Sequence, residues 1–408
     1  MGQWMDQVTR GWLIYQITGS PLQLGLSTAM RGIPFLLFGV VAGTTADRSG
    51  RKAQLVIAQS SNAVVNVILA TLVVTHQVQP WHIYVTAFIA GTVQTFQQPA
   101  RQTLISDIVA GPKLMNALAL NSAALNASRT FGPAAAGIII ALIGSHGSYY
   151  VQAVLYVFAT IWTLQMKVPD AAPEMSRQAR EPFFQSMGNG LVYVAKERNI
   201  RTLMILALAP MTLGMPYISL MPIFAIDVLH GGSRLQGFLL GTIGAGGLAG
   251  ALIVASMNRK NGYAWPVVMG ATLFGISLIS FALSSWVFLS IVLAGVTGIF
   301  SVTYQTQNQT LLQILAPRRL RGRVMSIFLL NRGLVPVGAL IAGTLAYYLD
   351  GPRALLIMGS ASLGVVALVL LISPGFLSLK VPFQEESPRE PSADEKPSTP
   401  AKPPSSSP

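Results

Sequence analysis

The sequence contains no cysteine, and only 10% of its 408 residues are charged. The absence of cysteine excludes disulfide bonds, zinc–thiolate sites and cysteine nucleophiles. Because a soluble domain usually carries about 25% charged residues, most of this chain has too little polar surface to face water. Apolar residues make up 52% of the chain, and the mean hydropathy is +0.55. This composition predicts a membrane protein with several spans.

The motifs of common enzyme and nucleotide-binding sites are also missing. The chain has no GxxxxGK[ST] loop for nucleotide phosphates, no HExxH and no GxSxG, and its four histidines lack metal-ligand spacing. We therefore expect no enzyme activity, no cofactor and no metal. The net charge is +13, but the bases fall in particular loops, so we expect no nucleic-acid partner.

Charge-free runs place the membrane helices, because about 20 apolar residues cross a bilayer core. Two long runs are divided by turns, "GSHGS" at 144–148 and "LSSW" at 283–286. The sequence predicts an all-α membrane protein of twelve transmembrane helices, of which the first is short, charged and apparently truncated. The expected spans are 3–17, 21–46, 53–75, 80–106, 114–143, 148–167, 201–227, 235–257, 263–283, 286–314, 322–348 and 354–377.

The loops between these spans differ in charge. Lys and Arg number sixteen in one alternate set of loops and two in the other. Cytoplasmic loops carry such an excess of bases, so the basic stretch "GTTADRSGRK" at 43–52 and both termini are predicted to be cytoplasmic. We expect a multi-pass protein of the cell inner (plasma) membrane.

A polar stretch in the middle of the chain divides six spans from six. We predict an N-terminal six-helix bundle at 1–167, a cytoplasmic linker at 168–200 and a C-terminal six-helix bundle at 201–380. Within the linker, "QSMGNGLVYVAKER" fits either a short amphipathic helix or one or two turns. The Pro/Ser-rich end, 381–408, predicts a disordered cytoplasmic tail.

The two groups of six spans share a pattern. Arg129 stands four residues before Pro133 in the fifth span, and Arg332 stands four residues before Pro336 in the eleventh. Small residues follow in both places. Two homologous six-helix halves would produce this spacing, so the bundles are predicted to be pseudo-symmetric.

Two motifs carry a resemblance to a known family. The stretch "GTTADRSGRK" resembles the loop between the second and third helices of the major facilitator superfamily. "GPAAAG" after Arg129 resembles the fifth-helix motif of antiporter members, with Ala136 where a glycine is usual. The surrounding sequence resembles a bacterial branch that includes the enterobactin siderophore exporter and multidrug exporters. The matching positions are Gly43, Asp47, Arg48, Gly50, Arg51 and Lys52 in the loop, and Arg129, Gly132, Pro133 and Gly137 in the helix.

The resemblance implies a secondary active transporter whose two bundles rock about a central cavity. It implies that the loop is a cytoplasmic gating latch; the alternative is an ordinary turn that only fixes topology. We expect export of a small amphipathic molecule, drug-like or siderophore-like, by proton antiport with alternating access. The alternatives are an uptake symporter of the same fold and a non-transporting membrane sensor or scaffold. The expected partners are the substrate, protons and the lipid bilayer, and we expect a monomer.

Charged residues inside the spans are costly in a membrane and are functional candidates by default. Asp6 and Arg10, four residues apart on one helix face, are candidates for proton coupling, and so is Arg101, which resembles the family's fourth-helix arginine. Asp6 either exchanges a proton or forms a permanent ion pair with Arg10. Arg129 and Arg332 either face the cavity or extend toward the membrane surface.

Polar and aromatic side chains on the spans are candidates for substrate contacts. For each of them the alternative is an interhelical hydrogen bond that holds membrane helices together. The candidates are Gln94, Gln98, Asn126, Tyr304, Asn308 and Arg332.

Overall fold

The computed structural model describes residues 1–48, 50–109, 113–166, 183–257, 262–317, 320–377 and 379–381. Within these ranges the fold is all-α, as predicted, apart from a two-residue antiparallel pairing of β1 (Gly262–Tyr263) with β2 (Lys380–Val381). The long helices are α1 (Gly2–Thr18), α2 (Pro21–Arg48), α3 (Arg51–Val74), α4 (Pro80–Ile108), α5 (Leu114–Gln165), α9 (Ser233–Ser256), α10 (Trp265–Leu283), α11 (Val287–Leu315) and α14 (Gly351–Ile372).

Local sequence signals set the ends of these helices. Gly19 ends α1 in the left-handed conformation, with φ 57°, and its N–H donates to the Tyr15 carbonyl oxygen at 2.8 Å. Pro80 occupies the first turn of α4, where its missing N–H costs nothing. Gly144, with φ 77°, interrupts α5, so this element of 52 residues comprises two spans that meet near the predicted turn.

Two spans of the C-terminal half are built from shorter pieces. One runs through α7 (Arg198–Ala209), the π-helical turn η2 (Pro210–Gly214), α8 (Tyr217–Ile223) and a second π-helical turn, η3 (Phe224–Val228). The other runs through α12 (Arg321–Leu330), the 3₁₀ turn η4 (Asn331–Leu334) and α13 (Val335–Leu349). Pro336, in the first turn of α13, prevents a continuous α-helix there. Breaks of this kind are frequent at functional sites.

With α5 divided at Gly144, the helices account for the twelve predicted spans. Seven helices in the described residues have the length and apolar composition to cross a membrane: α3, α5, the span 198–228, α9, α10, α11 and α14. Helices α1, α2 and α4 are not among the seven, and they contribute most of the polar side chains to the cavity described below.

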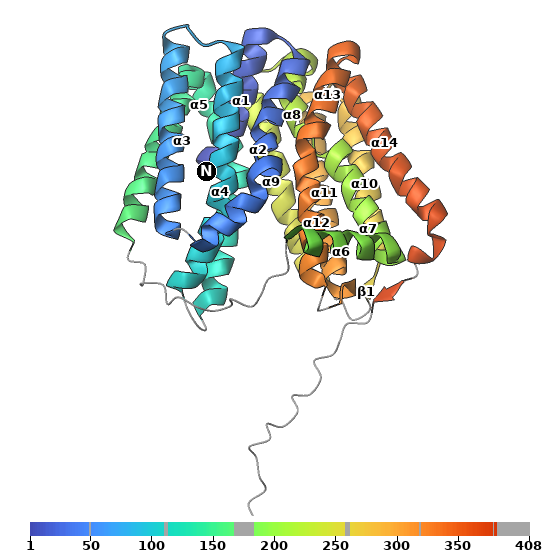
Figure 1. Cartoon of the computed structure of the whole chain (residues 1–408). Helices are drawn as coiled ribbons and strands as arrows, with labels where there is room; N and C mark the ends of the chain where they lie inside the picture. Colours follow the sequence, from blue (N-terminus) through green and yellow to red (C-terminus); the bar gives the residue numbers. More distant parts are fainter. Residues whose placement is uncertain are drawn as a thin grey trace, which may run out of the picture.

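The helices form two halves that lie side by side (Figure 1). In the N-terminal half α2 packs on α4 and α3 on α5, and in the C-terminal half α9 packs on α11 and α10 on α14. Two helix pairs join the halves, α2 with α13 and α5 with α9. These pairs join the second span to the eleventh and the fifth span to the eighth. A repeat of six spans converts one pair into the other, as expected for two homologous halves.

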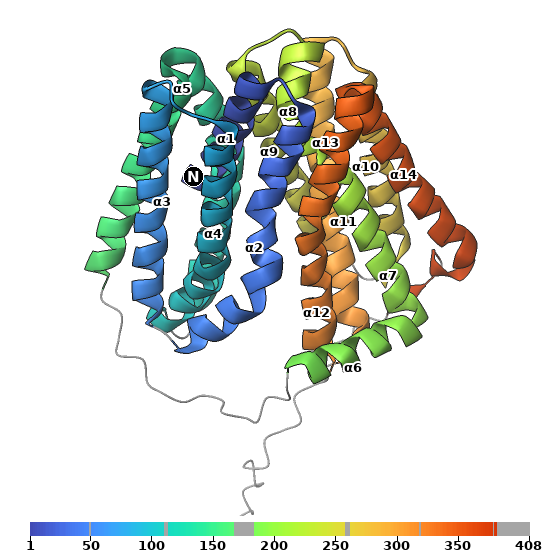
Figure 2. The same cartoon turned by 45° about the horizontal axis from the view of Figure 1, so that its top comes forward.

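The molecule has two distinct ends. We call the end where α2 finishes and α3 begins, and where α5 finishes, the linker end; α6 (Phe183–Lys196) lies there, within the stretch expected as a linker. We call the opposite end, where short turns join α1 to α2 and α3 to α4, the short-loop end. Figure 2 shows the linker-end parts of α2 and α4 lying away from α6 and α12.

Candidate functional site

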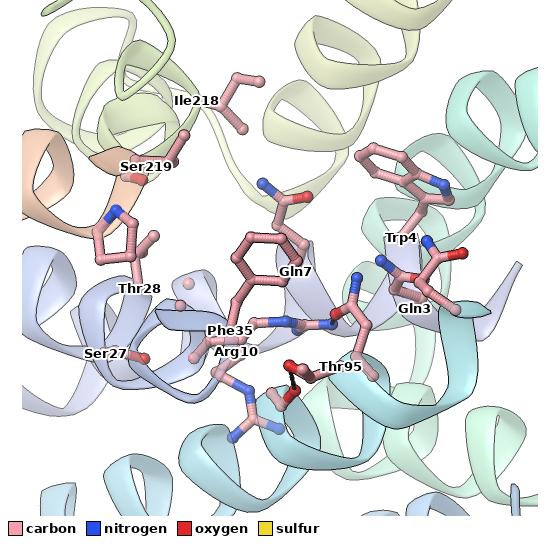
Figure 3. A pocket seen from close by; sticks show the side chains of 18 of the residues that line it. Gln3, Trp4, Gln7, Arg10, Ser27, Thr28, Phe35, Thr95, Ile218 and Ser219 are labelled. Atoms are coloured by element: carbon pink, nitrogen blue, oxygen red, sulfur yellow. Dashed lines mark hydrogen bonds between the residues drawn. The ribbon is translucent and has the colours of Figure 1, made fainter. Parts of the chain in front are cut away.

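A cavity of about 670 Å³ lies between the two halves. Its volume is within the range of about 300–1,000 Å³ that holds small-molecule ligands. Helices α1, α2 and α4 form one wall, and η2, α8, α9 and α13 form the other, so side chains of both halves face the same space (Figure 3). The polar and aromatic lining residues are Gln3, Trp4, Gln7, Arg10, Ser27, Thr28, Arg31, Phe35, Gln94, Thr95, Gln98, Gln102, Ser219 and Gln236.

Two seams of small residues bring the halves together toward the short-loop end. In the seam between α2 and α13, a Cβ built on Gly25 would lie 2.5 Å from the Ala339 carbonyl oxygen. In the seam between α5 and α9, a Cβ on Gly237 would lie 2.8 Å from the Gly137 Cα. No larger residue fits at such distances, so these glycines allow the backbones of the two halves to touch.

A hydrogen bond also crosses between the halves at the short-loop end. The Tyr15 hydroxyl, in the last turn of α1, donates to the Asp227 carboxylate in η3. Tyr15 is buried and Asp227 is exposed. We call this pair the Tyr15–Asp227 latch. Together with the two seams, it holds the short-loop end of the interface closed.

The cavity extends in the other direction. Gln98 and Gln102, which lie toward the linker end of α4, line the cavity and are themselves exposed. Gln94, one turn earlier, lines it as well. The cavity is therefore accessible from the linker end and closed toward the short-loop end.

A buried charge cluster forms the N-terminal wall of the cavity. Asp6 and Arg10 are only 5% and 4% exposed. Arg10 pairs with both carboxylate oxygens of Asp6, with Nη2–Oδ1 at 2.9 Å and Nε–Oδ2 at 3.3 Å. Its Nη1 donates to the Ile83 carbonyl oxygen at 3.1 Å and to the Thr86 hydroxyl at 2.7 Å. Asp6 and Arg10 therefore form an ion pair here, which was one of the two interpretations of Asp6 from the sequence.

A third charge completes this cluster. Arg31 of α2 donates from Nη1 to the same Asp6 carboxylate, and its Nη2 lies 3.4 Å from Gln94 Oε1. Gly91 permits this arrangement, because a Cβ there would lie 2.0 Å from the Arg31 carbonyl oxygen and force α4 away from α2. Asp6 thus faces two guanidinium groups.

The fifth-helix motif lies at the interface between the halves. The Arg129 guanidinium lies 5.7 Å from the centre of the Trp4 ring, within the range of a cation–π contact. A Cβ on Gly132 would lie 2.8 Å from Trp4 Cβ, and the Gly137 carbonyl oxygen accepts a hydrogen bond from the Ser233 hydroxyl at 3.2 Å. The motif thus joins α5 to both α1 and α9.

The loop at 43–52 is only partly described. Gly43, Asp47 and Arg48 belong to the last turns of α2, and their side chains lie outside the described part of the structure. Gly50 precedes the first turn of α3, which contains Arg51 and Lys52. Lys52 Nζ donates to the carbonyl oxygens of Leu164 and Met166 at 2.7 and 2.8 Å, so it caps the C-terminus of α5 within its own half.

Two of the residues expected in the cavity lie elsewhere. The Tyr304 hydroxyl donates to the Leu206 carbonyl oxygen at 2.7 Å, and Asn308 Nδ2 donates to the Leu203 carbonyl oxygen at 3.1 Å. Both side chains are buried and hold α11 against α7. In this conformation both residues make the interhelical hydrogen bonds that were the alternative to substrate contact, and membrane helices use such bonds to pack together.

The remaining predicted residues are distributed more widely. Asn126 is not among the lining residues, and its Nδ2 donates to the Ser122 carbonyl oxygen within α5 at 3.0 Å. Arg101 donates to Gln98 Oε1 at 3.1 Å, separately from the charge cluster. The side chain of Arg332 lies outside the described residues.

Several wall residues, among them Arg31 and Gln236, were assigned no role from the sequence. Arg31 lies inside an apolar run, which was a usable signal, but its span offers no acid as a partner on the same helix face. Gln236 is 1% exposed, lines the cavity, and its Oε1 has no hydrogen-bond partner among the described residues. Its position in the first turn of α9 is typical of an ordinary helix end, so no pattern pointed to it.

Comparisons with known proteins agree with this architecture. A family profile described as transmembrane secretion effector matches residues 1–400. The chain is 26% identical over 380 residues to the staphyloferrin A transporter of Staphylococcus aureus, which covers 91% of this chain and 93% of that protein. It is also 26% identical over 342 residues to the multidrug efflux pump Tap of Mycolicibacterium fortuitum, covering 82% and 83% of the two chains.

Solved structures show the same fold at lower identity. A bacterial homologue of the human lysosomal transporter Spinster, in an inward-facing and unoccupied conformation, superimposes with a TM-score of 0.74 at 14% identity, covering 92% of this chain and 95% of the other. The nucleoside transporter NupG superimposes with a TM-score of 0.66 at 15% identity, covering 91% and 96%.

Proposed function

Since the chain belongs to the transmembrane secretion effector family of the major facilitator superfamily, it is a membrane transporter and not an enzyme, and we propose that it exports a small amphipathic molecule by proton antiport with alternating access. The observation that carries this proposal is the cavity between the halves, which is accessible from one end and closed at the other. Its apolar and polar lining suits an amphipathic ligand.

Alternating access requires that the same cavity opens to each side in turn. The basic loops lie at the linker end, so by the positive-inside rule we propose that this end faces the cytoplasm and that the cavity is open to the cytoplasm in this conformation. We propose an inner-membrane monomer with both termini cytoplasmic. Its proposed moving bodies are the bundles 1–167 and 201–380, joined by the linker 168–200; the tail expected at 381–408 lies, apart from Val381, outside the described residues.

The relatives support the substrate class. One is named for a siderophore and another for multidrug efflux, so the cavity is proposed to take a siderophore-like or drug-like molecule. Trp4 and Phe35 supply aromatic surface for such a ligand, and Gln94 and Gln98 supply hydrogen-bonding groups. The loop at 43–52 is proposed to act as the cytoplasmic gate.

Asp6 is the proposed proton carrier. It is the only buried acidic side chain in the described parts of the chain, and it contacts two arginines that line the cavity. An intramembrane acid in contact with a substrate pathway is the usual place for proton coupling. Coupling requires that Asp6 loses a partner in part of the cycle, because a carboxylate held by two guanidinium groups retains its charge.

One observation favours a second candidate, proton symport. Asp6 pairs with Arg31 as well as with Arg10, so uptake of a proton by Asp6 removes a competitor and leaves Arg31 more available to an anion. By reciprocity an anion on Arg31 then favours proton uptake by Asp6. For an anionic substrate this linkage moves the proton and the substrate in the same direction.

Inside-out vesicles with a pH-sensitive dye in the lumen distinguish these functions. On adding hydrophobic cations or siderophore-like anions, antiport makes the lumen more alkaline as the substrate enters, and symport makes it more acidic. In either case we expect Asp6→Asn to abolish the response. If inserted protein gives no dye response to any compound while the compounds still accumulate, proton coupling is refuted; if none accumulates, transport of these classes is refuted.

A further inference from the structure

The buried charge cluster holds one more positive charge than negative. Asp6 carries one carboxylate, whereas Arg10 and Arg31 carry two guanidinium groups. Arg10 is satisfied by the protein, because it bonds to both oxygens of Asp6 and to two groups on α4. The surplus charge therefore belongs to Arg31.

Arg31 also has unused hydrogen-bonding capacity. A guanidinium group has five N–H donors. Among the residues that the structure describes, Arg31 has the bond to Asp6 and one long contact of 3.4 Å to Gln94. The side chain is 19% exposed and lines the cavity, so its remaining donors are accessible from there.

The surroundings reinforce the positive charge. Arg129 lies against Trp4, which lines the same cavity. The other acids whose side chains the structure describes, Glu197, Asp227 and Asp350, are exposed and do not line the cavity. An uncompensated charge in surroundings of low dielectric constant is stabilised by a bound ion of opposite sign.

We propose that the cavity binds a small organic anion whose acid group pairs with Arg31 and whose apolar part packs against Trp4 and Phe35. Guanidinium groups bind carboxylates well because two N–H groups can donate in parallel. The volume of about 670 Å³ and the aromatic lining favour an organic acid over an inorganic ion. The inference rests on the proposed transport function, because a transporter requires a ligand in its cavity. It does not depend on whether protons move with the substrate or against it.

Three probes with one skeleton test the charge preference: 2-naphthoate, 2-naphthamide and 2-naphthylmethylammonium. Each is measured with the purified full chain by equilibrium dialysis, with naphthalene fluorescence as the readout. We expect saturable binding of the naphthoate, and binding of the amide and the ammonium weaker by about tenfold or more, since a charge-assisted hydrogen bond is lost.

Variants then locate the site. Arg31→Gln should weaken naphthoate binding about tenfold or more, and Arg31→Lys should weaken it less, because the charge remains while the two parallel N–H donors are lost. Asp6→Asn should strengthen binding, since it removes the competing carboxylate; a gain of this kind does not result from misfolding. Arg234→Gln is the matched control, because Arg234 is exposed at the start of α9 and outside the cavity, and it should bind naphthoate like the parent protein.

Three results would overturn the inference: no saturable naphthoate binding, equal binding of the ammonium probe, or unchanged naphthoate binding in Arg31→Gln. Loss of naphthoate binding when sodium chloride is added at the same concentration as the naphthoate would assign the charge to an inorganic ion instead. Dialysis involves no transport, so the two proposals fail separately. Selective binding without substrate movement in vesicles would refute transport, whereas substrate movement without acid selectivity would refute the anion site.

Discussion

The Tyr15–Asp227 latch predicts how the cavity opens at the short-loop end. The hydroxyl of Tyr15 and the carboxylate of Asp227 belong to opposite halves, so their hydrogen bond exists only while that end is closed. A hydrogen bond to a charged group contributes about 1.5–3 kcal/mol, and the exposure of Asp227 reduces this to about 1–2 kcal/mol. Tyr15→Phe should therefore raise the population open at the short-loop end about 5- to 30-fold.

The absence of cysteine makes this population measurable. Ser219→Cys places a single thiol in the cavity of a chain that has no other. In vesicles that present the short-loop end to the bath, a membrane-impermeant maleimide labels this thiol only when the short-loop end opens. When opening and closing are faster than labelling, the labelling rate is proportional to the open population. We expect Tyr15→Phe to increase the rate by the same factor.

Tyr84→Phe is the matched control for this experiment. The Tyr84 hydroxyl donates to Gln23 Oε1 at 2.6 Å, so the same chemical change removes a hydrogen bond between α4 and α2 of one half. It should leave the labelling rate near that of the parent. Equal rates for the Tyr15 and Tyr84 variants would refute the assignment of the latch, and so would a Tyr15 variant that labels like the parent while its thiol remains reactive from the linker end.

Further predictions concern the seams, the helix cap and the loop. Gly237→Ala should push α9 from α5 and increase the same labelling, because its Cβ would lie 2.8 Å from the Gly137 Cα, whereas Gly364→Ala, with no atom within 4 Å of its Cβ, should not. Lys52→Met should lower the thermal unfolding midpoint, since capping of helix-terminal carbonyls contributes about 0.3–1 kcal/mol, while the exposed Lys113→Met, at the N-terminus of α5, serves as its control in the same melt. Asp47→Asn should slow vesicle transport without reducing membrane insertion, and normal turnover would argue against the gating role of the loop.

The positions of the helices could be predicted because the bilayer imposes a length on each span. The observed helix α9 (Ser233–Ser256) differs by only a few residues from the predicted span 235–257, and Gly144 interrupts α5 at the predicted turn. Helix ends depend on local signals such as glycine, proline and charge, which a single sequence contains. The same reasoning indicated that Asp6 and Arg10 share a helix face, and the structure pairs them.

The partners of polar residues could not be predicted, because they depend on how the helices cross. Tyr304 and Gln94 are both polar groups within membrane helices, yet one bonds to a backbone carbonyl of α7 and the other lines the cavity. Arg31 of α2 pairs with Asp6 of α1, and α2 at the same time lies close against α4 at Gly91. Neither crossing follows from the period of one helix.

The seam between α2 and α13 restricts the motion that can open the short-loop end. Gly25 of α2 touches α13 toward that end. About two turns further along α2, Gly32 meets Pro336 of α13 at the cavity wall, where a Cβ on Gly32 would lie 2.0 Å from the proline ring. Packed helices do not compress, so the halves do not simply approach each other at the linker end. In the proposed alternating access they roll on the contact between Gly32 and Pro336 while the backbones at Gly25 separate. The helix that carries Arg31 is then one of the two that move, so the ligand proposed at Arg31 would move with the N-terminal half.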